Sequence, residues 1–146
     1  MKTIYITSFF SIFFSFISVS QNWYTSFDEA QKQAISQNKN MVLVFQGSDW
    51  CAPCIKLDKD VWSSQEFQNL ANKHFIMLKA DFPRKKANKL SKTLTEQNAK
   101  LAEMYNTQGF FPLVVLLDTK ANVLGKMGYE KITPTAYFNK LIAFEK

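Results

Sequence analysis

The chain has 146 residues, of which 47% are hydrophobic and 21% charged, and its formal net charge is +6. This length is enough for one domain with a hydrophobic core and excludes two ordinary domains, and the hydrophobic content is that of a globular protein. With two cysteines and one histidine, a structural zinc site, which needs four ligands, is not expected.

Residues 1–20 have the pattern of a secretory signal peptide. Lys2 precedes an apolar run from about Ile4 to Val19, which is shorter than the about 20 residues that a bilayer span needs. The run ends in Ser-Val-Ser, small residues of the kind that signal peptidase recognises. We therefore predict a cleaved signal over residues 1–20, one domain over residues 21–146, and a periplasmic or otherwise extracytoplasmic location, where disulfides persist. An uncleaved N-terminal anchor is the alternative.

Capping residues and apolar runs predict the elements of the first half of this domain. Ser26 and Glu29 form a capping box, which opens a helix ending at about Gln37. The apolar run Met41–Phe45 predicts a strand buried on both faces, as in a parallel or mixed sheet. A helix beginning near Cys51 follows this strand directly.

Helices and strands continue to alternate in the second half. Ser63 and Glu66 form another capping box, and the helix that follows ends at His74. The later elements are a strand at Phe75–Leu78, a long polar helical region up to Gly109, strands at Leu113–Leu117 and 123–128, and a helix opened by Thr133 and Pro134. This alternation predicts an α/β fold with a central sheet and helices on both faces.

Positive charge is concentrated in the stretch PRKKANKLSK, residues 83–92. Lys85, Lys89 and Lys92 have the spacing of one helix face. We favour a solvated face here; the alternative is a site for an acidic partner or for anionic lipid headgroups. Nucleic acid is not an expected partner outside the cytoplasm.

The two cysteines of the chain, Cys51 and Cys54, lie in the motif WCAPC at the start of a predicted helix. There the first thiolate lies beside unpaired backbone N–H groups and the positive end of the helix dipole, which lower its pKa from about 8.5. Such a thiolate can attack a disulfide and form a mixed disulfide at Cys51. Cys54, one turn deeper, can then resolve it.

Three other roles for the cysteines are less favoured. A structural disulfide that closes so short a loop removes little entropy from the unfolded chain. A copper site would need Cys51, Cys54, His74 and a methionine, but no Met or His is close to the cysteines in sequence. A Cys–His hydrolase would need His74 beside Cys51, whereas a cation at the end of a helix complements the helix dipole.

A buried strand followed by WCAPC and a helix, and much later GFFPLVVLLD, resembles the thioredoxin superfamily over roughly Ser26 to Lys146. The resemblance implies the thioredoxin fold, an α/β fold with a central mixed β-sheet flanked by helices on both faces. With GSDWC, VWSSQEF and the secretory signal, the chain is most similar to extracytoplasmic thioredoxin-like proteins of bacteria, which are related to the soluble domain of the thiol–disulfide interchange reductases.

The resemblance also implies roles for five residues. Cys51 is the attacking thiol, Cys54 the resolving thiol with which it forms the redox-active disulfide, and Trp50 a lid beside the pair. Pro112 is the cis-proline opposite the sulfurs, and the backbone at Phe111, just before it, pairs with an extended substrate segment by strand addition. Neither a cofactor nor a metal is implied.

The chain departs from the thioredoxin pattern at several positions. Phe45 stands where thioredoxins carry a buried Asp, six residues before the first cysteine, so the proton of the resolving thiol must leave by another route, such as water. Phe111 stands where thioredoxins have Thr before the cis-proline. Because little precedes Ser26, the first strand of the family is short or absent.

The expected function is that of an extracytoplasmic thiol–disulfide oxidoreductase acting on protein thiols and disulfides. We expect a reductase, because Ala-Pro between the cysteines is closer to the Gly-Pro of reducing thioredoxins than to the Pro-His of strong oxidants. A reductase in this compartment needs an electron donor, for which a membrane-embedded protein is expected, and we expect a monomer. The alternative is a thioredoxin-fold binding module that holds a partner or a copper ion, with incidental redox activity.

Export should remove the N-terminal segment. We expect a mature N-terminus at or near Gln21 and a soluble product, because the apolar run is short and ends in small residues. Mass spectrometry of the protein from the exported fraction checks this. Recovery of the chain with Met1 intact in a membrane pellet would contradict it.

Overall fold

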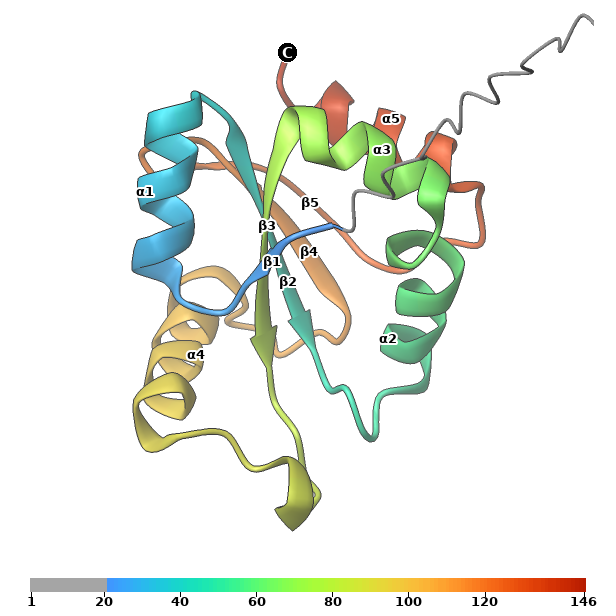
Figure 1. Ribbon diagram of the computed structural model, residues 1–146. Helices are drawn as coiled ribbons and strands as arrows, with labels where there is room; N and C mark the ends of the chain where they lie inside the picture. The colour runs from blue at the N-terminus through green and yellow to red at the C-terminus, as the bar shows by residue number, and fades with distance from the viewer. Residues whose placement is uncertain (1–20) are drawn as a thin grey trace, which may run out of the picture.

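The computed structural model describes residues 21–146, which form a five-stranded sheet with helices on both faces (Figure 1). The predicted signal, residues 1–20, lies outside the described residues. The strands are β1 (Trp23–Tyr24), β2 (Asn40–Gln46), β3 (Phe75–Asp81), β4 (Leu113–Leu117) and β5 (Val123–Met127), and the helices are α1 (Phe27–Gln37), α2 (Ala52–Leu57), α3 (Gln65–His74), α4 (Lys92–Tyr105) and α5 (Pro134–Ala143). No helix within residues 21–146 is long and apolar enough to cross a membrane.

The sheet is mixed, and β2 is its central strand. The strand order is β1-β3-β2-β4-β5. Both β1 and β2 run parallel to β3, whereas β4 runs antiparallel to β2 and to β5. The α/β class and the mixed sheet are thus confirmed. The first strand is short, as expected, with 2 residues paired to β3.

Each face of the sheet carries its own hydrophobic core. Helices α1 and α4 cover one face, and α2, α3 and α5 cover the other (Figure 1). Because side chains alternate along a strand, β2 contributes to both cores. Val42 and Val44 pack on the side of α2, whereas Met41, Leu43 and Phe45 pack on the side of α1 and α4.

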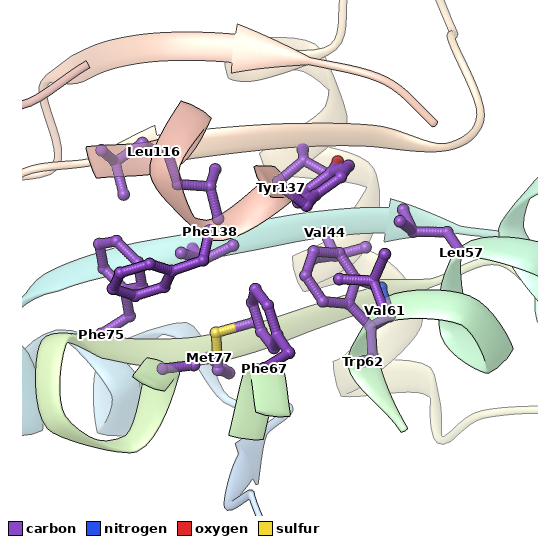
Figure 2. Packing of buried hydrophobic residues seen from close by; sticks show 14 of the residues in the cluster. Val44, Leu57, Val61, Trp62, Phe67, Phe75, Met77, Leu116, Tyr137 and Phe138 are labelled. Carbon is purple, nitrogen blue, oxygen red and sulfur yellow. The ribbon is translucent and has the colours of Figure 1, made fainter. Parts of the chain in front are cut away.

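Trp62 lies at the centre of the core on the α2 side (Figure 2). It is 2% exposed and ends the π-helical turn Asp58–Trp62 that follows α2. Its ring makes edge-on contacts with Phe67 of α3 at 4.8 Å and with Tyr137 of α5 at 5.3 Å between centroids. The ring of Trp23 lies 5.8 Å away. One side chain thus joins two helices to the first strand.

The first predicted cap is confirmed and the second is displaced by one residue. Ser26 Oγ accepts a hydrogen bond from Glu29 N at 3.3 Å. At α3 the cap is Ser64, whose Oγ accepts from Phe67 N at 3.1 Å, and not Ser63. Ser63 is instead the C-cap of the preceding π-helical turn, and its N–H donates to Asp58 O at 2.8 Å.

The expectation of a basic helix face in residues 83–92 is wrong. This segment is a loop with a short 3₁₀ turn, Lys86–Asn88. Helix α4 begins only at Lys92, after Ser91, whose Oγ accepts from Leu94 N at 3.2 Å. Because the cap stops the helix there, Lys85 and Lys89 belong to the loop.

Removing the Tyr137 hydroxyl should weaken the fold. The hydroxyl donates to Gly128 O at 2.8 Å, and burial raises the pKa of Tyr137, so it keeps its proton. We expect Tyr137→Phe to lower the free energy of unfolding by about 1–2 kcal/mol, because the carbonyl loses its partner. Urea denaturation checks this. The control is Tyr129→Phe, which removes an exposed hydrogen bond to Asp60. Equal losses of unfolding free energy in the two variants would contradict the prediction.

Candidate active site

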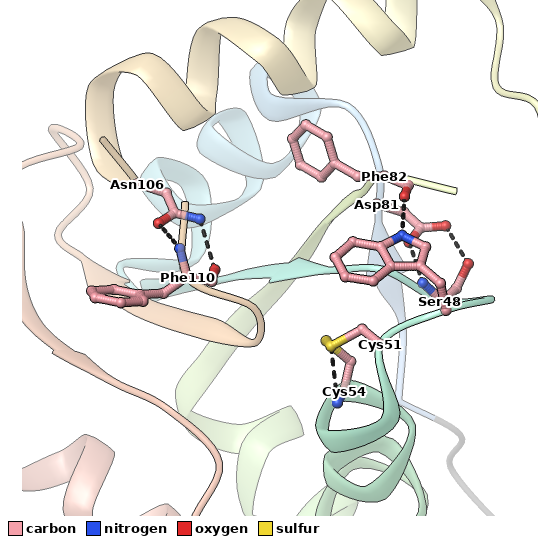
Figure 3. Close-up of a disulfide and its surroundings, with 8 residues drawn as sticks. Ser48, Cys51, Cys54, Asp81, Phe82, Asn106 and Phe110 are labelled. Atoms are coloured by element: carbon pink, nitrogen blue, oxygen red, sulfur yellow. Dashed lines mark hydrogen bonds between the residues drawn. A yellow bond between two sulfur atoms is a disulfide. The ribbon is translucent and has the colours of Figure 1, made fainter. Parts of the chain in front are cut away.

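The two cysteines form a disulfide at the start of α2, directly beyond the central strand (Figure 3). Their Cα atoms are 5.2 Å apart. Cys51 is the N-cap residue of α2, and Pro53 lies in the first turn, where its missing N–H costs no helix bond. The predicted position of the pair at a helix start is therefore confirmed.

Exposure does not distinguish the two cysteines, but hydrogen bonding does. Cys51 is 3% and Cys54 4% exposed in the disulfide form, so the deeper position of Cys54 along the helix does not make it the more buried of the two. Cys54 N donates to Cys51 Sγ at 3.3 Å (Figure 3). A donor at this place favours negative charge on Cys51 once the disulfide is reduced.

Trp50, predicted as a lid, is held in place from several sides. Its Nε1 donates to Phe82 O at 2.7 Å, and its ring meets that of Phe111 edge-on at 5.4 Å. The guanidinium of Arg84 lies 3.8 Å from the centre of the Trp50 ring. A Cβ atom at Gly47 would lie 2.2 Å from the same ring, so the ring can occupy this position only over a glycine.

The loop before β4 brings Phe111 and Pro112 to the site. The Phe111–Pro112 peptide bond is cis, as the resemblance implied. Asn106, buried after the end of α4, accepts from Phe110 N at 2.9 Å and donates to Phe110 O at 2.8 Å (Figure 3). Sequence reasoning missed Asn106. The available signal was an Asn at a predicted helix end, four residues before a Phe-Phe-Pro segment.

A groove runs beside the cis-proline. It has a volume of about 440 Å³, and its lining includes Pro53, Phe111, Pro112, Gly128 and Tyr129. Pro53 lies between the cysteines in sequence, so the groove borders the first turn of the helix that carries them. Of the predicted binding residues, the structure brings Phe111 and Pro112 together here. Trp50 does not line the groove, but its ring contacts that of Phe111, which does.

Cys54 opens into a smaller cavity on the other side of α2. This cavity, of about 230 Å³, is lined by Gln46, Ser48, Cys54, Ile55, Asp58 and Lys79. Lys79 Nζ lies 3.8 Å from Asp58 Oδ1. Two ionisable side chains, Asp58 and Lys79, therefore line the same cavity as Cys54.

Phe45 does not occupy the position expected for it. Its ring is buried on the side of α1 and α4, 6.4 Å from the ring of Phe82. Cys54 belongs to α2 on the opposite face, where Val44 and Gln46 point. The separation of six residues from Cys51 did not predict on which face of the sheet the Phe45 side chain lies.

His74 lies away from the cysteines. Its ring contacts Phe138 at 5.2 Å and lines a hollow with Asn40, the first residue of β2, whereas the cysteines follow the other end of that strand. The Cys–His hydrolase and the copper site that use His74 are therefore excluded. Within residues 21–146, no three His, Cys, Asp or Glu side chains gather as a metal site would require.

Comparisons with known proteins agree with this geometry. The family model described as thioredoxin-like matches residues 22–119. Disulfide bond reductase DsbH of Chlamydia pneumoniae is 33% identical over 125 residues, 86% of this chain and 74% of that protein. The solved structure of a DsbH oxidoreductase is 29% identical with a TM-score of 0.79, over 98% of this chain and 94% of that one.

A more distant likeness concerns the fold alone. The C-terminal domain of DsbD from Neisseria meningitidis, in its oxidised form, is 14% identical with a TM-score of 0.54, over 80% of this chain and 90% of that one. The family match covers most of the chain and includes the motif WCAPC at residues 50–54. The chain therefore belongs to the thioredoxin-like family and is a thiol–disulfide oxidoreductase, and its two cysteines, Cys51 and Cys54, form a disulfide.

Proposed function

We propose that this protein is an extracytoplasmic reductase of protein disulfides that uses its Cys-Ala-Pro-Cys pair. The observation that carries the proposal is the bond from Cys54 N to Cys51 Sγ, at 3.3 Å, next to the groove of the cis-proline. This bond makes Cys51 the better nucleophile, and the groove supplies a place for an extended substrate segment that pairs with the backbone at Phe111.

The reaction transfers two electrons in two steps. The Cys51 thiolate attacks one sulfur of the substrate disulfide, and the other substrate sulfur leaves as a thiolate. Cys54 then loses its proton and attacks Cys51 Sγ, which releases the second substrate thiolate and closes the Cys51–Cys54 disulfide. The substrate disulfide is reduced to two thiols, and the protein dithiol is oxidised.

The relatives and the motif support the proposed direction and partners. The relative from Chlamydia pneumoniae is named a disulfide bond reductase, and Ala52-Pro53 is close to the Gly-Pro of reducing thioredoxins. Repeated turnover requires a dithiol donor, for which we propose a membrane-embedded protein. The secretory pattern of residues 1–20 supports the location, with residues 21–146 as a monomeric mature domain.

Substitution of the second cysteine should trap substrates. We expect Cys54→Ala to accumulate a mixed disulfide between Cys51 and a substrate protein, because no thiol remains to resolve it. Cys51→Ala should trap little and lose turnover. Non-reducing electrophoresis with mass spectrometry of the linked peptides measures both. If Cys54→Ala captures no partner through Cys51, the reductase proposal is wrong and a binding module becomes the better account.

The proton of Cys54 should leave through the cavity that holds Asp58. We expect Asp58→Asn to slow the release of a mixed disulfide about tenfold and to leave the first attack unchanged, because a carboxylate that shares the cavity can accept the proton through water. Stopped-flow measurement of both steps checks this. The control is Glu103→Gln, an exposed acid on α4, and equal rates in both variants would exclude Asp58 from this role.

A further inference from the structure

A second hollow lies on the far side of Trp50 from the cis-proline groove. It has a volume of about 590 Å³ and is bounded by the end of β3, the loop of residues 82–91 and the start of α4. Its apolar walls come from Trp50, Phe82, Leu90 and Phe111. Because Phe111 lines both hollows, they share one wall, which contacts the Trp50 ring. We call this hollow the basic pocket, for the charges described next.

The rim of the basic pocket is positively charged. Arg84, Lys85, Lys86 and Lys89 all belong to its lining. Among residues 21–146, none of these four side chains forms a salt bridge. The acidic member of the lining is Asp81, whose carboxylate accepts from Ser48 N at 2.9 Å and from Ser48 Oγ at 2.6 Å. The pocket therefore combines an apolar interior with a lining in which cations outnumber acidic groups.

The loop that carries these charges is fixed to the active-site turn. Asp49 accepts hydrogen bonds from Arg84 N, Lys85 N and Asn88 Nδ2, each at 3.0 Å. These bonds, led by that of Arg84, lower the pKa of Asp49, so the carboxylate stays ionised at neutral pH. Asp49 precedes Trp50 in sequence, and Arg84 stacks on the Trp50 ring. The charged rim therefore has a fixed position relative to the turn that leads to the cysteines.

We propose that the basic pocket binds an acidic segment of the disulfide-bearing substrate protein, with an apolar or aromatic side chain inside and flanking carboxylates on the rim. This inference rests on the proposed function and names the substrate class of the same site. A segment anchored in the pocket can continue past Phe111 into the cis-proline groove, which brings a neighbouring disulfide to Cys51.

The shape of the pocket favours a peptide over a membrane surface. Residues that bind membranes project their apolar side chains into the headgroup region. Here Phe82, Leu90 and Phe111 are partly buried and face a hollow, so a flat lipid surface does not reach them, whereas a single side chain of an extended peptide does. The charges add attraction that acts over about one Debye length, roughly 8 Å at physiological salt.

Binding can be tested without turnover. The probe is a blocked, cysteine-free peptide of alternating Glu and Asp around one Phe, titrated calorimetrically against the oxidised mature protein. We expect Lys85→Gln, Lys86→Gln and Lys89→Gln together to weaken binding about tenfold, and salt at about 0.5 M to do the same. The control triple, Lys32→Gln, Lys73→Gln and Lys120→Gln, removes equal charge at exposed sites elsewhere and should bind as the unaltered protein does.

Selectivity provides the second readout. The ratio of kcat/KM for a disulfide within the acidic peptide to kcat/KM for hydroxyethyl disulfide should fall about tenfold in the pocket triple and stay constant in the control triple. Equal binding or equal ratios in the two triples would overturn the inference, as would binding to phosphatidylglycerol vesicles without binding of the peptide. A protein that binds the peptide and reduces neither disulfide would instead contradict the proposed function.

Discussion

The burial of β2 on both faces is the constraint on which the rest of the structure depends. Its interior residues are all buried, and it pairs with β3 on one side and β4 on the other, so it cannot move without disturbing both cores. The chain leaves this strand at Gln46 and reaches Cys51 after a tight turn. The central strand therefore sets the position of the disulfide, and the cis-proline groove is completed by the loop that precedes β4.

Polar side chains perform a second task, which is to join loops that the sheet alone would leave independent. The Asp49 carboxylate accepts a hydrogen bond from the backbone of the loop after β3, and that of Asp81 accepts one from Ser48 N. The Asn106 side chain accepts one from Phe110 N in the segment before β4. These bonds are made to backbone groups that would otherwise lack partners near the rim of the sheet. The cysteines, the cis-proline and the basic loop thus form one rim although they are far apart in the chain.

Much of this arrangement could be predicted from the sequence, because its signals are local. A continuous apolar run specifies a buried strand such as Leu113–Leu117, a Ser before a Glu specifies a cap, and the Cys-x-x-Cys spacing specifies two cysteines close enough to form a disulfide. The errors have a common origin in tertiary structure. The face that Phe45 occupies depends on the pairing of β2, the cap moved to Ser64 because the preceding turn is π-helical, and residues 83–92 form a loop because Asp49 binds its backbone from outside the segment. The pattern of apolar residues within one segment does not predict contacts with residues outside that segment.

The aromatic rings on the α1 and α4 side form an unbroken series from the core to the surface. Phe45 lies 6.4 Å from Phe82, Phe82 lies 5.4 Å from Phe111, and Phe111 lies 5.4 Å from Trp50, measured between ring centroids. Close-packed interiors pass small displacements on to their neighbours. A change of side-chain volume at the wholly buried Phe45 is therefore expected to displace Trp50, which precedes Cys51 in the chain. With the proposed function, substitutions in the core and changes in the range of substrates are then coupled. Homologues with a different residue in place of Phe45 are expected to differ in the substrate proteins that they select.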